Sequence, residues 1–230
     1  MNRNTCKVLV LLICAIAPMS VMAEAPISVP YGTAVSVDGT MNAEEWADAS
    51  RVELPRSAEL WLKHDHDSLY VGIRASELGM FVGNLCVIRD SFLDIYHSSA
   101  ALGTATYRWE PTPSSWILAR QFSWRCRRLG FSPAAVQERE RFFADEGWVA
   151  SISYLGRPDE MEYQLTVPCE PMCVWLALLP SSGGELLYWP EIADQDIFPG
   201  PIPEQAHIGL DSWARLILEP APAVARTASE

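Results

Sequence analysis

The chain has 230 residues, of which 49% are hydrophobic and 20% are charged, and it contains nine tryptophans. This composition excludes a disordered chain, a collagen-like chain and a small disulfide scaffold, and the length fits a single domain. The 29 acidic and 17 basic residues give a formal net charge of −12. A general nucleic-acid binder is therefore not expected, because binding the phosphate backbone requires a concentrated positive field.

Residues 1–23 predict a secretory signal. Arg3 and Lys7 supply the positive start, Val8–Ala17 form an apolar run, and Val21-Met22-Ala23 ends on the small residues typical of a cleavage site. No later segment reaches the ~18 consecutive apolar residues that a membrane-spanning helix needs. We therefore expect a secreted or periplasmic protein with no transmembrane segment once the signal is removed.

Four cysteines follow this signal, and an oxidising compartment favours disulfides between them. Cys169 and Cys173 are spaced to close a small loop, which would leave Cys86 to pair with Cys126. Four cysteines allow three connectivities, and the sequence does not choose among them. A zinc site is not favoured, because the C-x3-C spacing lacks a C-x2-C or a nearby histidine partner.

The body of the chain is a series of short alternating segments separated by turn residues, with 17 Pro and 13 Gly spread along it. In one segment Leu69, Val71 and Ile73 share a face, which is the period of a half-buried strand. The predicted strands are Ala34–Val37, Glu59–Lys63, Leu69–Ala75, Leu85–Tyr96, Thr104–Trp109, Trp116–Phe122, Trp148–Tyr154, Glu162–Val167, Val174–Leu179 and Ala214–Leu218.

One α-helix is predicted between Ser132 and Gly147. Ser132 is placed to cap the helix, Pro133 fits its first turn, and Gly147 ends it. Many strands and one inserted helix predict an all-β fold, a β-sandwich of antiparallel sheets with a jelly-roll or immunoglobulin-like topology. The predicted domain covers residues 24–218, and the Ala- and Pro-rich residues 219–230 are predicted to be disordered.

Three blocks of the sequence resemble family 9 carbohydrate-binding modules, within the wider DOMON-like group. The first block, residues 35–50, carries the turn pair Asp38-Gly39 followed by Trp46. The second, residues 59–75, contains H-D-H-D-S-L-Y-V, and the third, residues 90–97, reads D-S-F-L-D-I-Y-H. The resemblance covers most of the chain after the signal in order, and it implies a β-sandwich that binds a saccharide without catalysing a reaction.

In that family, aromatic rings stack on the sugar while nearby carboxylates bind its hydroxyls. The resemblance points to Asp90 for a carboxylate and to Trp189, with Phe198 beside it, for one stacking position. Val87 occupies the position of the other stacking tryptophan, and Phe81 is the nearest aromatic residue. The expected ligand-binding residues are therefore Phe81, Asp90, Trp189 and Phe198.

Two alternatives to saccharide binding stay open. Val87 favours an envelope or secreted protein-interaction domain that keeps the fold without a sugar site. DOMON-like relatives also include haem binders, for which Met80, His97, Met161 and His207 are the available axial donors. No C-x-x-C-H haem-attachment motif is present, so the haem interpretation ranks below the other two.

No enzyme and no obligatory cofactor are expected. The motif G-x-S-x-G is absent, and Ser98-Ser99 beside His97 does not define an oriented triad. His64 and His66, with Asp65 between them, form either a metal cluster or a hairpin turn, and the turn is favoured because Asp and Ser are common there. The resemblance leaves a structural calcium ion open, with no ligands assigned.

Overall fold

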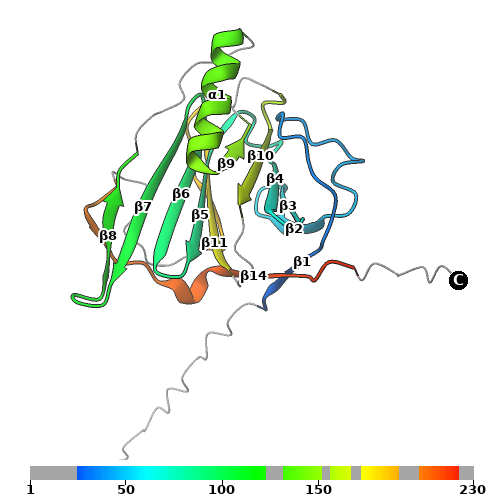
Figure 1. The fold of residues 1–230 in the computed structure, drawn as a ribbon. Coiled ribbons are helices and arrows are strands. Elements are labelled where there is room, and N and C mark those ends of the chain that lie inside the picture. The colour runs from blue at the N-terminus through cyan, green and yellow to red at the C-terminus, as the bar shows by residue number, and fades with distance from the viewer. Residues whose placement is uncertain (1–24, 123–131, 152–155, 167–171, 192–201, 223–230) are drawn as a thin grey trace, which may run out of the picture.

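The computed structural model describes residues 25–122, 132–151, 156–166, 172–191 and 202–222. They form two β-sheets packed face to face, with one helix at the end of the sandwich (Figure 1). The predicted all-β sandwich with an inserted helix is thereby confirmed. The signal segment, Cys126, Cys169 and Phe198 lie outside these residues. No helix in the described ranges is long and apolar enough to cross a membrane.

The larger sheet contains β1 (Ile27–Val29), β5 (Phe81–Arg89), β6 (Phe92–Ser98), β7 (Leu102–Glu110), β8 (Ser115–Arg120), β11 (Met172–Pro180), β12 (Leu187–Trp189), β13 (Gln205–Ala206) and β14 (Ala214–Leu218). Their spatial order is β1-β14-β11-β5-β6-β7-β8-β13, and β12 pairs with β11. The β1–β14 pair is parallel and the other pairs in this sheet are antiparallel.

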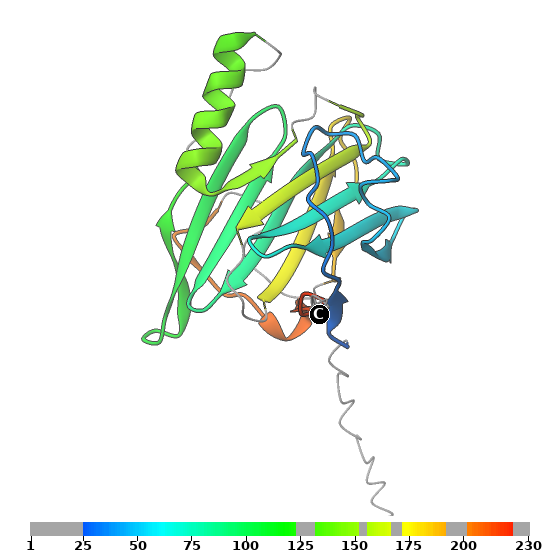
Figure 2. The same cartoon turned by 45° about the vertical axis from the view of Figure 1, so that its right-hand side comes forward.

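The smaller sheet contains β2 (Ser50–Leu54), β3 (Ala58–His64), β4 (Ser68–Arg74), β9 (Trp148–Ala150) and β10 (Glu160–Thr166). Its order is β2-β3-β4-β10-β9, and all its pairs are antiparallel. Figure 2 shows this sheet lying across one part of the larger one. Strands β7 and β8 lie to the side of the smaller sheet (Figure 1).

Apolar side chains are buried in three layers. The main core lies between the sheets and includes alternate residues of both, such as Leu62 of β3 and Leu85 of β5. A second cluster, which includes Trp175 and Trp213, lies on the outer face of the larger sheet. A third, around Trp46, lies on the outer face of the smaller sheet. The high tryptophan content is therefore explained mostly by packing.

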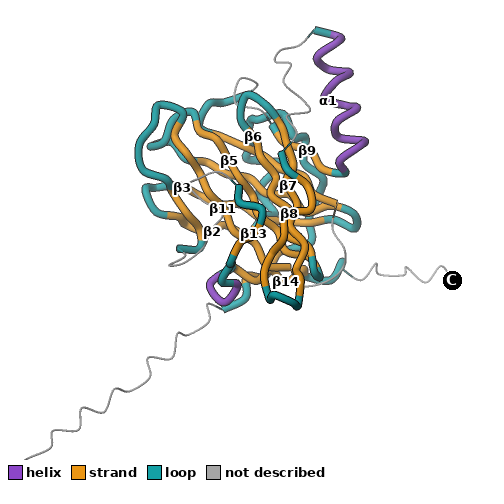
Figure 3. Tube along the Cα trace, turned by 90° about the vertical axis from the view of Figure 1, so that its left-hand side faces the viewer, coloured by secondary structure: helices purple, strands orange, loops and turns teal. Residues whose placement is uncertain are grey.

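Helix α1 (Pro133–Glu146) begins and ends where the sequence predicts. The Ser132 hydroxyl accepts a hydrogen bond from the Ala135 N–H, and Gly147 adopts a left-handed φ of 71° and donates its N–H to the Phe143 carbonyl. Phe142 packs edge-on against Trp148 at a ring distance of 5.3 Å. Figure 3 shows the helix standing at one end of the strands.

Several predicted strands differ in their bounds. The predicted strand Leu85–Tyr96 is two strands, because Asp90 adopts a positive φ of 54° in the two-residue turn that joins β5 to β6. Residues 34–37 are not a strand. The short strands β1, β2, β12 and β13 were not predicted. Strands β1 and β13 pair with strands distant in the sequence, whereas β2 and β12 pair with a strand adjacent in the chain.

The segment of residues 30–49 crosses the outer face of the smaller sheet and is held by two carboxylates of β10. Glu162 accepts hydrogen bonds from the Gly39 N–H at 2.8 Å, and Glu160 accepts one from the Met41 N–H at 2.7 Å. Both glutamates are buried and lie two residues apart, so their side chains share one face of the strand. The Asp38-Gly39 block is thus fixed to the sheet beneath it.

Candidate functional site

The two described aromatic residues predicted to stack on a sugar are buried. Phe81 is 1% exposed and Trp189 is 7% exposed, and both belong to the core between the sheets. Neither ring offers a face to a ligand, which corrects the expectation for these residues. In β12 the alternation of the strand places Tyr188, rather than Trp189, on the outer side, where it stacks on Trp175 at 5.4 Å.

Asp90 and Trp189 are also far apart. Leu176 of β11 pairs with Trp189 on one side and with Leu85 on the other. Asp90 follows the end of β5, five residues beyond Leu85, which corresponds to about 17 Å along an extended strand. The structure therefore does not bring the predicted carboxylate and the predicted stacking ring into one site.

Asp90 lies instead in a surface hollow of about 270 Å³, which we call the Phe92 hollow. It is lined by Arg89, Asp90, Phe92, Asp94 and Thr106. Arg89 is the last residue of β5 and Asp90 begins the turn that follows it. Phe92 and Asp94 belong to β6. Thr106 belongs to β7, where it lies directly opposite Asp94 in the strand pairing. The hollow thus draws on three consecutive antiparallel strands of the larger sheet.

Asp94 is held at the centre of a hydrogen-bond network. Its Oδ2 accepts from Arg89 Nη2 at 2.7 Å, and its Oδ1 accepts from Thr106 Oγ1 at 2.7 Å. Arg89 Nη2 also donates to the Tyr96 hydroxyl at 2.7 Å, and Arg89 Nη1 donates to the Thr166 carbonyl at 3.2 Å. The Tyr96 hydroxyl donates to Asp94 Oδ2 at 3.3 Å, so three different side chains orient this carboxylate.

Charge is balanced within this network. Burial acts against the charge of Arg89, but Tyr96 and Asp94 outweigh it, so the pKa of Arg89 is raised above its usual value. Burial and the adjacent Asp94 raise the pKa of the Tyr96 hydroxyl, which stays protonated. Arg89 and Asp94 form an ion pair whose two charges cancel.

Phe92 and Asp90 take no part in the hydrogen-bond network around Asp94. Phe92 is 45% exposed, the most exposed large hydrophobic residue in the described part of the chain. Asp90 is exposed, and its side chain makes no hydrogen bond or ion pair with any other residue of the ranges described above. The hollow therefore presents an aromatic ring, an unpaired carboxylate and an ordered carboxylate–guanidinium pair to solvent.

Of the five residues that line the hollow, Asp90 was named from the sequence as a ligand-binding candidate and the other four were not. Phe92 and Asp94 belong to the block D-S-F-L-D-I-Y-H, and their spacing of two does place them on one face of a strand. This spacing could have identified Phe92 and Asp94 as neighbours on one face of the strand. Arg89 and Thr106 carry no comparable signal, because only strand pairing brings them beside Asp94.

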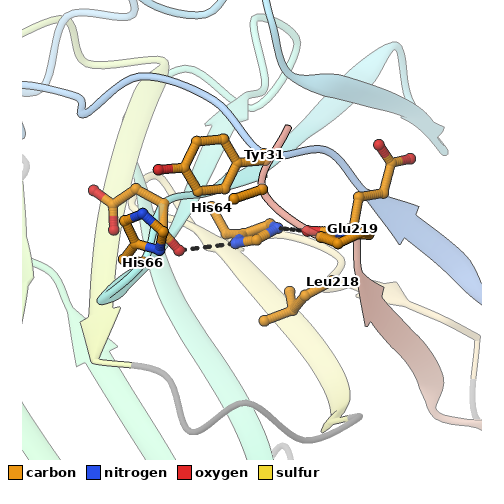
Figure 4. A pocket seen from close by; sticks show the side chains of 8 residues that line it. Tyr31, His64, His66, Leu218 and Glu219 are labelled. Atoms are coloured by element: carbon orange, nitrogen blue, oxygen red, sulfur yellow. Dashed lines mark hydrogen bonds between the residues drawn. The ribbon is translucent and has the colours of Figure 1, made fainter. Parts of the chain in front are cut away.

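A second pocket, of about 250 Å³, lies where both ends of the described chain meet the β3–β4 hairpin (Figure 4). Its lining includes Tyr31, His64, His66, Leu218 and Glu219. The Tyr31 ring lies edge-on to both histidine rings, at 5.5 Å from His64 and 5.2 Å from His66. The backbone N–H of Glu219 donates to the Val29 carbonyl at 2.9 Å.

This region forms a hairpin turn. Asp65 Oδ1 accepts from the backbone N–H groups of Asp67 and Ser68, both at 2.8 Å, as expected of an Asx turn. The two ring nitrogens of His64 lie 2.9 and 2.8 Å from the carbonyl oxygens of Asp65 and Glu219 (Figure 4). Among the described residues, no group of three or more His, Cys, Asp or Glu is arranged to hold a metal ion.

Two of the candidate haem donors are enclosed by the fold. His97 is 9% exposed, with its ring nitrogens 2.8 Å from Asn84 Oδ1 and 2.9 Å from Ser99 Oγ. Burial lowers its pKa from 6.5 to about 4, so the ring is neutral at neutral pH. Met161 is 2% exposed within the core. In this conformation neither side chain is presented to a cofactor.

The predicted disulfides are not found at the positions that can be described. Cys86 and Cys173 are free thiols. Cys86 is fully buried in the outer cluster of the larger sheet, directly opposite Trp175, and burial raises the pKa of its thiol. Their predicted partners, Cys126 and Cys169, lie outside the described residues.

Comparison with known proteins gives two solved structures of similar fold. A family 9 carbohydrate-binding module from Caldicellulosiruptor kristjanssonii in complex with cellotriose matches with 12% identity and a TM-score of 0.44, covering 90% of this chain and all of that one. A protein from Bacteroides uniformis that is proposed to bind carbohydrate matches with 10% identity and a TM-score of 0.47, covering 84% of this chain and 99% of that one. No family model and no curated protein sequence matches this chain.

Proposed function

We propose that this protein is a non-catalytic saccharide-binding domain and that the Phe92 hollow is its binding site. The observation that supports this most directly is the exposed Phe92 ring beside two aspartates, Asp90 and Asp94. A saccharide has C–H faces that pack on an aromatic ring and hydroxyls that bind carboxylates and guanidinium groups, so its site requires both kinds of group. The hollow combines them on one surface.

The ordering of the polar groups also supports binding. Because Asp94 is already fixed by Arg89 and Thr106, little side-chain entropy is lost when a ligand hydroxyl approaches it. Arg89 uses Nη1 and Nη2 in contacts within the protein, and its remaining N–H groups are donors for a hydroxyl. Donor and acceptor side by side suit a pair of neighbouring hydroxyls, since each hydroxyl both donates and accepts.

We further propose that the protein acts outside the cytoplasm. Support comes from residues 1–23, with Arg3 and Lys7 before the apolar run Val8–Ala17 and small residues at the predicted cleavage site. A fusion of residues 1–23 to a reporter that is active only after export tests this. Loss of reporter activity when Leu11 and Leu12 are replaced by Asp is the expected result, and unchanged activity contradicts it.

Isothermal titration with a panel of neutral oligosaccharides tests the binding function. At least one member of the panel is expected to bind the wild-type protein, and Phe92→Ala is expected to weaken that binding about tenfold or more, as for loss of an aromatic contact. Leu179→Ala is the matched control, because Leu179 is 38% exposed and lies outside the hollow.

Thermal unfolding of both variants separates binding from folding, since truncating a half-exposed ring is expected to change stability little. Equal affinity of the wild-type protein and Phe92→Ala for the same sugar contradicts the assignment of the hollow. Absence of heat with every sugar of the panel contradicts the function itself.

A protein-interaction domain is the second candidate. It is favoured by Trp109, which is 37% exposed on β7 and lies edge-on to Trp116 at a ring distance of 5.5 Å. Tryptophan is concentrated at interface hot spots. Purification of the protein from its native extract, with and without Trp109→Ala, tests this candidate. A partner recovered only with the wild-type chain supports it, and recovery of the monomer alone contradicts it.

A further inference from the structure

The charges of the Phe92 hollow do not cancel. Arg89 is neutralised by Asp94 at 2.7 Å. Arg108, directly opposite Phe92 in the β6–β7 pairing, is neutralised by Glu110 on its own strand. Asp90 remains as a carboxylate without a partner among the described residues. The hollow therefore carries one unbalanced negative charge, and it is located next to the exposed aromatic ring.

An unpaired carboxylate beside an aromatic face is the combination that binds an ammonium group. The carboxylate forms a charge-assisted hydrogen bond with the N–H groups, and the ring attracts the cation through its π face. Phe92 supplies the ring and Asp90 the carboxylate, both within one hollow of about 270 Å³. A divalent metal ion is a poorer fit, because hard cations take several oxygen ligands and Asp94 is already occupied by Arg89 and Thr106.

We propose that the Phe92 hollow selects saccharides that carry a protonated amino group. This inference rests on the proposed saccharide-binding function and names its ligand class. The amino group pairs with Asp90, the C–H face of the sugar packs on Phe92, and neighbouring hydroxyls bind the Arg89–Asp94 pair. An acidic saccharide is disfavoured, because its carboxylate or sulfate meets Asp90 while Arg89 is held by Asp94.

The protein as a whole favours the same ligand. Its formal net charge of −12 gives a negative field that attracts cationic polymers and repels anionic ones.

The backbone conformation at Asp90 permits a test by a single substitution. Asp90 has a φ of 54°, a conformation that Asn tolerates well, so Asp90→Asn removes the charge without straining the turn.

Three matched oligosaccharides of equal length serve as probes in isothermal titration: oligomers of glucosamine, of N-acetylglucosamine and of glucose. Acetylation removes the charge from the amine, and the glucose oligomer replaces it with a hydroxyl. The glucosamine oligomer is expected to bind the wild-type protein about fivefold to tenfold more tightly than either neutral oligomer. This preference is expected to shrink when ionic strength rises from about 0.01 M to about 1 M, because the Debye length falls from ~30 Å to ~3 Å.

Asp90→Asn is expected to abolish the preference, so that the glucosamine and glucose oligomers bind this variant with affinities within about twofold of each other. Glu53→Gln, which removes one charge from a highly exposed residue of β2, is the matched control and is expected to keep the preference. Retention of the preference in Asp90→Asn overturns the proposal, as does equal affinity of the wild-type protein for charged and neutral oligomers.

The same titrations separate this inference from the proposed function. Binding of the neutral oligomers without any preference for the amine overturns the inference alone. Absence of binding for every oligomer overturns both. A further titration uses Nα-acetyl-lysine amide, whose free ε-amine presents an ammonium group without a sugar ring. If it binds as tightly as the glucosamine oligomer, the site recognises amines of any source, such as a protein partner, and selection of a saccharide is overturned.

Discussion

The indole N–H of Trp46 donates a buried hydrogen bond to Glu162 Oε1 at 3.0 Å. The other oxygen of Glu162 accepts the backbone N–H groups of Gly39 at 2.8 Å and Asp38 at 3.1 Å. One carboxylate of β10 therefore fastens both the Asp38-Gly39 turn and the tryptophan that follows it. This contact explains why the two features of the first sequence block occur together, and it assigns them a structural role.

Replacing Glu162 is expected to loosen this segment. In Glu162→Gln the side-chain NH₂ group faces donors, so at least one buried N–H loses its acceptor. The expected cost is about 1–3 kcal/mol of unfolding free energy, measured by guanidinium denaturation. Glu53→Gln, at a highly exposed position of β2, is the control and is expected to leave the midpoint unchanged. Equal midpoints for Glu162→Gln and the wild-type protein would contradict the anchoring role.

Buried His97 is expected to make stability depend on pH. Its folded pKa is lowered by burial from 6.5 to about 4, so between these values the unfolded chain binds more protons than the folded one. The unfolding free energy therefore falls as pH drops from 6.5 toward 4, by about 3 kcal/mol in total. Denaturation at a series of pH values measures this slope. It is expected to flatten in His97→Gln and to persist in His66→Gln, whose ring is exposed.

The fully buried Lys63 depends on Asp48, whose carboxylate lies 2.6 Å from Lys63 Nζ. Burial acts to raise the pKa of Asp48, but hydrogen bonds from Lys63 and Thr33 outweigh it, so the net pKa lies below 3.8. Stability from this pair is thus present above pH 3.8 and is lost as pH falls through the lower, folded pKa.

Asp48→Asn leaves the Lys63 charge buried without its counter-ion and is expected to lower the unfolding free energy by about 1–3 kcal/mol. This loss is smaller than for a fully buried pair, because the Asp48 side chain is 36% exposed. Lys63→Met is expected to cost less, since it removes the buried charge and keeps the apolar stem. Chemical denaturation of both variants and of the double variant measures the coupling. A greater loss in Lys63→Met would show that the charge itself stabilises the fold.

Trp189 and Phe81 are expected to matter for folding. Because both are buried between the sheets, Trp189→Ala and Phe81→Ala are each expected to cost about 3–5 kcal/mol. Phe92→Ala, at a half-exposed ring, is expected to be nearly neutral. Thermal unfolding distinguishes the two groups. Unchanged stability of the Trp189→Ala variant would contradict the burial of this ring between the sheets.

Local signals predicted the parts of the fold that depend on neighbours in sequence. The helix between Ser132 and Gly147 is specified by its own caps, and both form as expected. The division of Leu85–Tyr96 into two strands was missed, because apolar residues continue on both sides of the Asp90 turn and hide the break. A positive φ at Asp90 is a property of the hairpin, which forms only when β5 and β6 pair.

The error at Trp189 has a related cause. The larger sheet carries apolar clusters on both faces, so alternation in L-L-Y-W-P does not reveal which ring points outward. Both Tyr188 and Trp189 have apolar surroundings, one against Trp175 and the other in the central core. Only the packing of the smaller sheet against one face defines the inside.

The sequence by itself determined the fold class and the capped helix, because alternation, caps and turn residues act over a few neighbours. Tertiary structure decided the candidate site. Arg89, Asp94 and Thr106 come from three different strands, and the register of β5, β6 and β7 brings their side chains within hydrogen-bonding distance. Register is fixed by the burial of a whole sheet face, which no local segment encodes.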